Sequence, residues 1–102
     1  MIEAATLLKP SGAIRYRIID GEAIVVQQAD ARVLNLNVLG SRILAALDGR
    51  TSVGDLVARL AGDYEVDPAV FLADVLRYLE ELSAAHVIEP VAAPVDGGSD
   101  GL

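Results

Sequence analysis

The sequence predicts an α+β fold, in which a three-stranded antiparallel sheet is followed by three helices. Two observations carry this prediction. Arginine alternates with β-branched and aromatic residues from residue 14, before a turn signal, and leucines recur at helical spacing over residues 38–84. A period of two turns one face of a strand toward a core, and spacings of three and four do the same for a helix. One domain is expected, because 102 residues is an ordinary domain length.

The strands are separated by turn residues. IRYRII at Ile14–Ile19 is typical of a half-buried strand. The next two residues, Asp20-Gly21, predict a two-residue hairpin, because both turn positions need a positive φ that Asp and Gly tolerate. A second strand is expected over residues 22–28, and after a turn near residue 30 a third follows at Arg32–Leu36. One edge of this sheet is expected to stay open.

Each helix begins with a residue whose side chain can cap it. Asn37 precedes a helix expected over residues 38–48, and Ser52 precedes a second helix that is expected to end near Gly62. Asp67 is followed by proline, which is a strong start signal, and opens the longest helix. The apolar face of that helix is formed by Leu72, Val75, Leu76, Leu79 and Leu82.

The segments at either end are expected to lie outside the domain, which spans residues 14–90. Residues 1–13 have no clear period, so they predict an irregular N-terminal lead-in. Residues 91–102 contain proline and a glycine-rich run with little apolar periodicity, and predict a disordered tail.

Composition excludes several classes of function. Fifteen acidic residues against eight basic ones give a formal charge of −7, which repels phosphate backbones and anionic membranes, so neither nucleic acid nor a membrane is expected as a partner. The absence of cysteine excludes disulfides and thiolate metal sites and fits a reducing compartment. No apolar run approaches the length of a membrane span, and the first residues do not resemble a signal peptide. We therefore expect a cytoplasmic protein.

No catalytic group is expected. His86 is the single histidine, so a capping or packing role is favoured over that of a base or ligand. Ser52, Asp55 and His86 supply the residue types of a hydrolytic triad, but no serine lies in a nucleophile-elbow pattern and Ser52 is expected to cap a helix. The sequence also has no phosphate-cradling glycine loop and no dinucleotide fingerprint. We expect no enzyme activity and no cofactor.

A calcium loop is the one metal site to weigh. Four carboxylates occupy its first, third, fifth and twelfth positions: Asp63, Glu65, Asp67 and Asp74. Pro68, however, stands where the loop needs glycine, and the Asp-Pro pair is better explained as a helix start. We expect no metal.

The third predicted helix carries a polar ridge beside its apolar face. Asp74, Tyr78 and Glu81 follow one another at spacings of four and three. The ridge is either a solvated surface that pairs its charges with Arg77, or a docking surface whose carboxylates meet cations of a partner. Composition alone favours the solvated surface. Tyr78 suits a docking surface, because an aromatic residue with one polar end fits an interface, but it fits the rim of the core equally well.

The sequence resembles the pyrroloquinoline-quinone synthesis protein D family (PqqD-like) in three segments: LNLNVLGSRILAALDGRTSVGDLVARL, YEVDPAVFLADVLRYLEEL and His86-Val87-Ile88. The resemblance covers about residues 14–89. It implies a winged-helix-like fold, which agrees with the order of elements read from the residues. It also implies that residues 14–90 form a peptide-binding domain.

Such domains are similar to recognition elements for ribosomally synthesised, modified peptides (RiPPs). The resemblance implies a chaperone that binds a precursor's leader peptide by strand addition and presents it to a modifying enzyme, such as a radical SAM protein, in peptide natural product or redox-cofactor biosynthesis. Backbone groups of an edge strand would give affinity, and pockets for alternate side chains would give selectivity. Carried onto this chain, the site would comprise Arg32, Val33, Leu34, Asn35 and Leu36 of the third strand and Phe71, Asp74, Val75, Tyr78 and Glu81 of the third helix.

Alternation assigns the two faces of that strand. Leu34 and Leu36 are expected to point to the core, and Val33 and Asn35 away from it.

The alternative function is an acidic winged-helix-like regulatory or protein-interaction module. DNA binding through this architecture is disfavoured, because Arg59 and Arg77 are the only bases in residues 53–85. A homodimer is compatible with the sequence, although no pattern indicates one.

Overall fold

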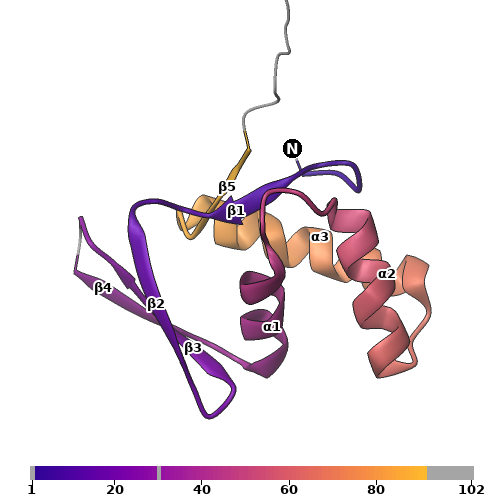
Figure 1. Cartoon of the computed structure of the whole chain (residues 1–102), viewed down its shortest axis with the longest axis horizontal. Coiled ribbons are helices and arrows are strands. Elements are labelled where there is room, and N and C mark those ends of the chain that lie inside the picture. Colours follow the sequence, from indigo (N-terminus) through magenta and orange to yellow (C-terminus); the bar gives the residue numbers. More distant parts are fainter. Residues whose placement is uncertain (1, 30, 92–102) are drawn as a thin grey trace, which may run out of the picture.

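The computed structural model describes residues 2–29 and 31–91. Their secondary structure is, in order, β1 (Leu8–Pro10), β2 (Ile14–Ile19), β3 (Glu22–Gln27), β4 (Arg32–Leu36), α1 (Val38–Ala46), α2 (Val53–Tyr64), α3 (Pro68–Ala84) and β5 (Ile88–Pro90) (Figure 1). The predicted α+β fold, with three strands followed by three helices, is confirmed. None of the helices in these ranges is long and apolar enough to cross a membrane.

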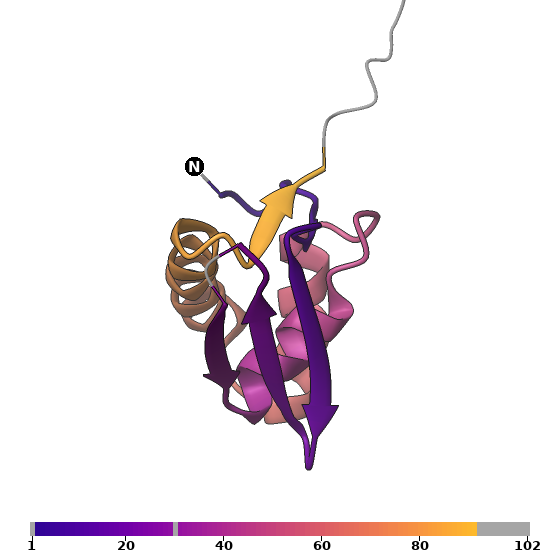
Figure 2. The same ribbon diagram turned by 90° about the vertical axis from the view of Figure 1, so that its left-hand side faces the viewer.

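The three-stranded sheet is antiparallel, with β3 in the centre and β2 and β4 at the edges. Figure 2 shows this sheet face-on, with the helices behind it and α3 beside the β4 edge. The hairpin between β2 and β3 has the predicted two-residue turn: Asp20 and Gly21 have φ of 52° and 83°, and Ile19 pairs with Glu22. Positive φ at both positions matches the twist of the strands that flank such a turn.

All three predicted caps are formed. The side chain of Asn37 accepts a hydrogen bond from the backbone N–H of Gly40 at 2.8 Å. Ser52 accepts one from Asp55, and the Asp67 side chain accepts one from the N–H of Ala69 two residues on. The start of each helix was therefore predictable, because capping depends on residues that are adjacent in sequence.

The two predicted helix ends were wrong. α1 ends at Ala46, two residues before the predicted end, because the next turn is held by the Asp48 side chain, which accepts hydrogen bonds from the N–H groups of Arg50 and Thr51. These bonds to the charged form lower the pKa of Asp48. Conversely, α2 continues through Gly62 to Tyr64. It ends at the next residue, Glu65, whose φ of 55° is left-handed.

The N-terminal segment is not irregular throughout. It contains β1, which pairs antiparallel with β5 and buries Leu8 to 1% exposure. Ahead of β1, the carbonyls of Ala4 and Thr6 accept hydrogen bonds from the first N–H groups of α2. The predicted C-terminal tail lies, apart from Val91, outside the described residues.

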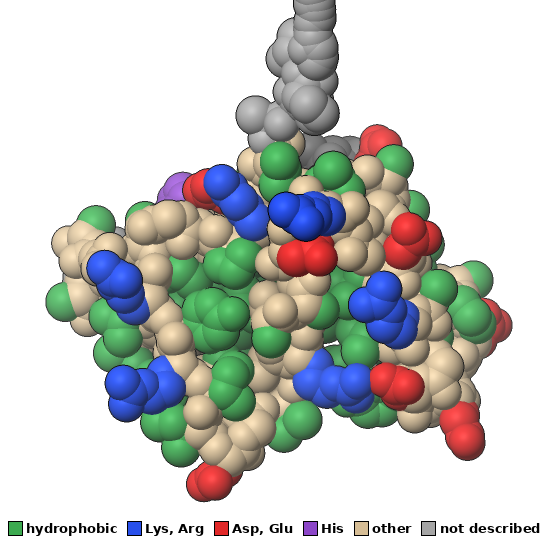
Figure 3. Space-filling view, in the orientation of Figure 1, with side chains coloured by type: hydrophobic (Ala, Val, Ile, Leu, Met, Phe, Trp, Pro, Cys, Tyr) green, Lys and Arg blue, Asp and Glu red, His purple; other side chains and the backbone are tan. Residues whose placement is uncertain are grey.

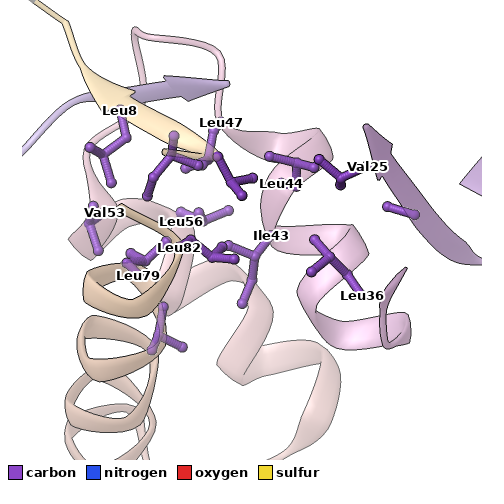
Figure 4. Packing of buried hydrophobic residues seen from close by; sticks show 14 of the residues in the cluster. Leu8, Val25, Leu36, Ile43, Leu44, Leu47, Val53, Leu56, Leu79 and Leu82 are labelled. Carbon is purple, nitrogen blue, oxygen red and sulfur yellow. The ribbon is translucent and has the colours of Figure 1, made fainter. Parts of the chain in front are cut away.

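One hydrophobic core joins the sheet to the helices and to β1 and β5. In Figure 4, side chains from α1 lie between Val25 of the sheet and those from the other helices and β1. The largest buried side chains come from every layer: Leu8, Ile43, Leu44, Leu56, Leu79, Val25, Val53, Val57 and Val87. Helix α1 is therefore the layer through which the sheet and α3 are held relative to each other.

A buried serine fixes the corner between β4 and α1. Ser41 is 2% exposed, and its hydroxyl accepts a hydrogen bond from the N–H of Ala23 in β3 at 2.6 Å. The hydroxyl lies 2.7 Å from the carbonyl of Asn37, to which it donates, and 3.2 Å from that of Leu36. The end of β4 is thereby tied to the sheet and to the first turn of α1.

Candidate functional site

The β4 edge of the sheet offers an unpaired row of backbone groups. β4 pairs with β3 on one side, and within residues 2–29 and 31–91 no strand pairs with its other side. Figure 2 shows α3 running beside this edge. An open strand edge is a ready-made template for pairing with another chain.

The hairpin turn determines which backbone groups point to the open side. A two-residue hairpin is closed by a hydrogen-bonded pair, here Ile19 and Glu22, and antiparallel pairs alternate from there. The bond from the N–H of Gln28 to the carbonyl of Ala13 fits this alternation. In β3, the backbone N–H and C=O groups of residues 23, 25 and 27 therefore point toward β4. Their partners in β4 use their backbone groups within the sheet, so Val33 and Asn35 direct theirs to the open edge.

A small pocket lies beside this edge, between α1 and α3. Its volume is about 170 Å³, and it is lined by Asn37, Leu39, Gly40, Ile43, Phe71, Asp74, Val75 and Tyr78. Four of the predicted site residues of the third helix thus come together in one pocket. The wall contributed by α1 was missed in the sequence.

Tyr78 and Gly40 approach each other closely across this pocket. A Cβ added to Gly40 would overlap the hydroxyl of Tyr78, so only glycine leaves room for the ring in this position. Partial burial, followed by the nearby carboxylate of Glu81, raises the pKa of Tyr78. The shift disfavours ionisation further, so the phenol is available as a hydrogen-bond donor in the pocket.

Gly40→Ala is expected to destabilise the fold by about 1–3 kcal/mol, because the new methyl group overpacks the contact with Tyr78. Urea unfolding measures the change. Gly62→Ala is the matched control, since nothing lies within 4 Å of a Cβ at that helical position, and it should be neutral or stabilising. Combining Gly40→Ala with Tyr78→Phe should recover part of the loss. A double variant as unstable as Gly40→Ala would contradict this assignment of the contact.

The ridge on α3 is acidic and largely exposed. Asp74 lies 3.7 Å from Arg77, but both side chains are more than half exposed, so this pair contributes little to stability. Glu81 makes no ion pair with any described residue. The self-paired interpretation of the ridge therefore applies to Asp74 and not to Glu81, whose carboxylate stands next to Tyr78.

Phe71, which lines the pocket, also lies against an aromatic residue outside it, Tyr64. The rings of Phe71 and Tyr64 lie 6.3 Å apart, and the guanidinium of Arg42 lies 5.4 Å from the Tyr64 ring. Arg42 also forms an ion pair with Asp63 at 2.7 Å. Asp63 and the helix cap Asp67, two of the carboxylates considered for calcium, thus have structural partners.

The predicted β4 residues differ in what they expose. Leu36 is buried in the core and Leu34 is half-buried against it, as the alternation predicted, whereas Val33 and Asn35 are exposed on the opposite face. Arg32 is exposed at the start of the strand. None of the five lines the pocket, so β4 is placed to contribute through its backbone edge.

Comparison with solved structures finds the same fold. A structure described as TbiB1 in complex with the TbiA(beta) leader peptide is 25% identical, with a TM-score of 0.74 over 82% of this chain and 98% of that chain. The solution structure of the PqqD truncation of Methylobacterium extorquens PqqCD is described as a functional, stand-alone RiPP recognition element. It is 23% identical and matches with a TM-score of 0.73 over 87% of this chain and 95% of that chain.

Sequence comparison identifies the family. Curated proteins gave no match. Residues 22–88, well over half of the chain, match the family described as coenzyme PQQ synthesis protein D (PqqD). The matched segment runs from β3 to the start of β5 and includes the open strand edge and both walls of the pocket. This chain therefore belongs to the PqqD family.

Proposed function

We propose that the chain binds the leader of a ribosomally made precursor peptide as an added strand along β4 and presents it to a modifying enzyme. The observation that carries this proposal is the open edge of β4 beside the pocket between α1 and α3. Family membership supports it, as does the TbiB1 structure, which contains a leader peptide. The chain acts by binding and has no reaction of its own.

Affinity and selectivity have separate sources in this arrangement. The N–H and C=O groups of Val33 and Asn35 pair with any extended backbone, which gives affinity independent of sequence. Alternate side chains of an added strand point to the helix side of the sheet. There the pocket receives one apolar side chain, while the carboxylates of Asp74 and Glu81 favour basic residues beside it.

An NMR titration of the labelled protein with the leader of a small peptide encoded beside its gene tests the proposal. Amide shifts concentrated in residues 32–40 and 71–81 are expected. We call the β4 edge and the neighbouring pocket between α1 and α3 the leader groove. If saturating peptide leaves these amides unshifted, leader binding at this groove is refuted, and a parallel DNA titration would then test the regulatory alternative.

Tyr78→Ala is expected to weaken leader binding by about 1–2 kcal/mol, because a half-buried aromatic side chain with a polar end is a typical interface anchor. Calorimetry measures the affinity, and circular dichroism should show nearly unchanged helix content. Tyr16→Ala is the matched control, since Tyr16 is exposed on β2, the edge strand opposite β4. Equal effects of the two substitutions would remove Tyr78 from the site.

A further inference from the structure

The face of the sheet that points away from the helices is rich in apolar side chains, and no element within residues 2–29 and 31–91 covers it. Ile19 is 52% exposed and Val33 63% exposed, and Ile24 and Val26 lie between them on the central strand. In Figure 2 no described element lies in front of this face. A shallow hollow of about 370 Å³ on it is lined by Arg15, Tyr16, Arg17, Ile19, Ile24 and Val26. We call Arg15, Arg17, Ile19, Ile24, Val26 and Val33 the outer face; Tyr16 pairs with the buried Val25 and therefore points to the helix side of the sheet, at the border of the hollow.

The outer face is more basic than the rest of this acidic molecule, since two arginines lie on it beside one exposed carboxylate, Glu22 at the hairpin end. Arg15 and Arg17 lie on the same face of β2, opposite Val26 and Ile24, and neither forms an ion pair with a residue that the structure describes. Figure 3 shows basic side chains among hydrophobic ones over the sheet, whereas acidic side chains are more frequent over the helices. With a formal charge of −7 on the whole chain, this local reversal of sign selects an acidic partner surface.

We infer that the outer face docks an acidic, apolar surface of the enzyme that modifies the precursor peptide. The inference rests on the proposed function and adds a second surface to it. The leader groove opens at the β4 edge, beside α3, while the two arginines and the hollow lie on β2 and β3. One molecule can therefore hold the leader and the enzyme at the same time.

A second copy of the chain fits the outer face poorly. If two copies met through this face, Arg15 and Arg17 of both copies would be gathered in one interface, where like charges are costly. If the face met the acidic α3 ridge of a second copy, the leader groove of that copy would be covered. An acidic surface on the enzyme avoids both conflicts.

Strand addition would also enlarge the outer face. Side chains of an added strand alternate between the two faces of the sheet, so half of the leader's side chains would lie next to Val33 and Asn35 on the outer face. An enzyme docked there would contact the protein and the bound leader together. It is therefore expected to bind the leader complex more tightly than the free protein.

The double variant Arg15→Glu/Arg17→Glu tests the inference. The probe is the purified peptide-modifying enzyme encoded beside the gene, and its affinity is measured with and without saturating leader. We expect the double variant to weaken enzyme binding about tenfold or more, and added salt to weaken wild-type binding. Arg50→Glu/Arg59→Glu is the matched control, because it changes net charge equally at two exposed arginines away from this face.

Leader affinity of the same variants separates the two proposals. The outer-face variant should bind leader within about twofold of wild type, since the substituted residues lie on β2. The docking inference would be overturned if the enzyme bound the double variant as tightly as it binds the wild-type protein. It would also be overturned if the enzyme did not bind the wild-type protein, or if the control variant lost as much affinity for the enzyme as the double variant does. If the wild-type protein does not bind the leader, the proposed function is overturned instead.

Discussion

Val33→Pro is expected to weaken leader binding by about 2–4 kcal/mol, roughly 30- to 1000-fold, because it removes a backbone donor from the open edge and leaves a leader carbonyl unpaired. The N–H of Val33 makes no bond within the sheet, so proline costs no β3–β4 hydrogen bond. Calorimetric titration with the leader peptide gives the affinity, and urea unfolding gives the stability of the variant.

Ile18→Pro separates loss of the edge from a general effect of proline. Ile18 follows the same alternation on β2, so its N–H points to the opposite open edge of the sheet. The same residue type is thus introduced into an edge strand far from α3. Leader affinity should stay within about threefold of wild type. Strand addition at β4 is refuted if Val33→Pro binds the leader as tightly as Ile18→Pro does.

Most of the fold was predictable from short-range patterns. The hairpin follows from two adjacent residues, Asp20 and Gly21, and each helix start follows from one capping side chain. The faces of β4 follow from alternation alone, because Leu34 and Leu36 turn inward and Val33 turns outward. These features depend on neighbours in sequence.

The features that were missed depend on contacts between distant residues. β1 is a three-residue strand whose partner Glu89 lies at the other end of the domain, so no local pattern marks it. The α1 wall of the pocket was also missed, since helical spacing indicates an apolar face without indicating what lies opposite. Gly40 was the available signal, because a conformationally costly residue inside a helix indicates a close approach, here by the Tyr78 ring. The ten site residues proposed from the sequence stay a prediction that the titration tests.

Leu44→Ala is expected to destabilise the protein by about 2–5 kcal/mol, because it leaves a cavity where a fully buried side chain links the sheet to the helices. A loss of this size is a large part of the total stability of a domain this small. The melting temperature should fall by about 4–8 °C per kcal/mol, as measured by thermal unfolding followed by circular dichroism.

The same substitution tests whether α1 sets the geometry of the groove. α1 packs against β3 and β4 and also lines the pocket with α3, so a cavity beneath it should loosen the two walls relative to each other. Leader affinity should therefore fall even under conditions where the variant is fully folded. Val38→Ala, at an exposed position of the same helix, should change neither stability nor affinity appreciably. If folded Leu44→Ala binds the leader with wild-type affinity, the groove does not depend on this packing, and the β4 edge alone determines binding.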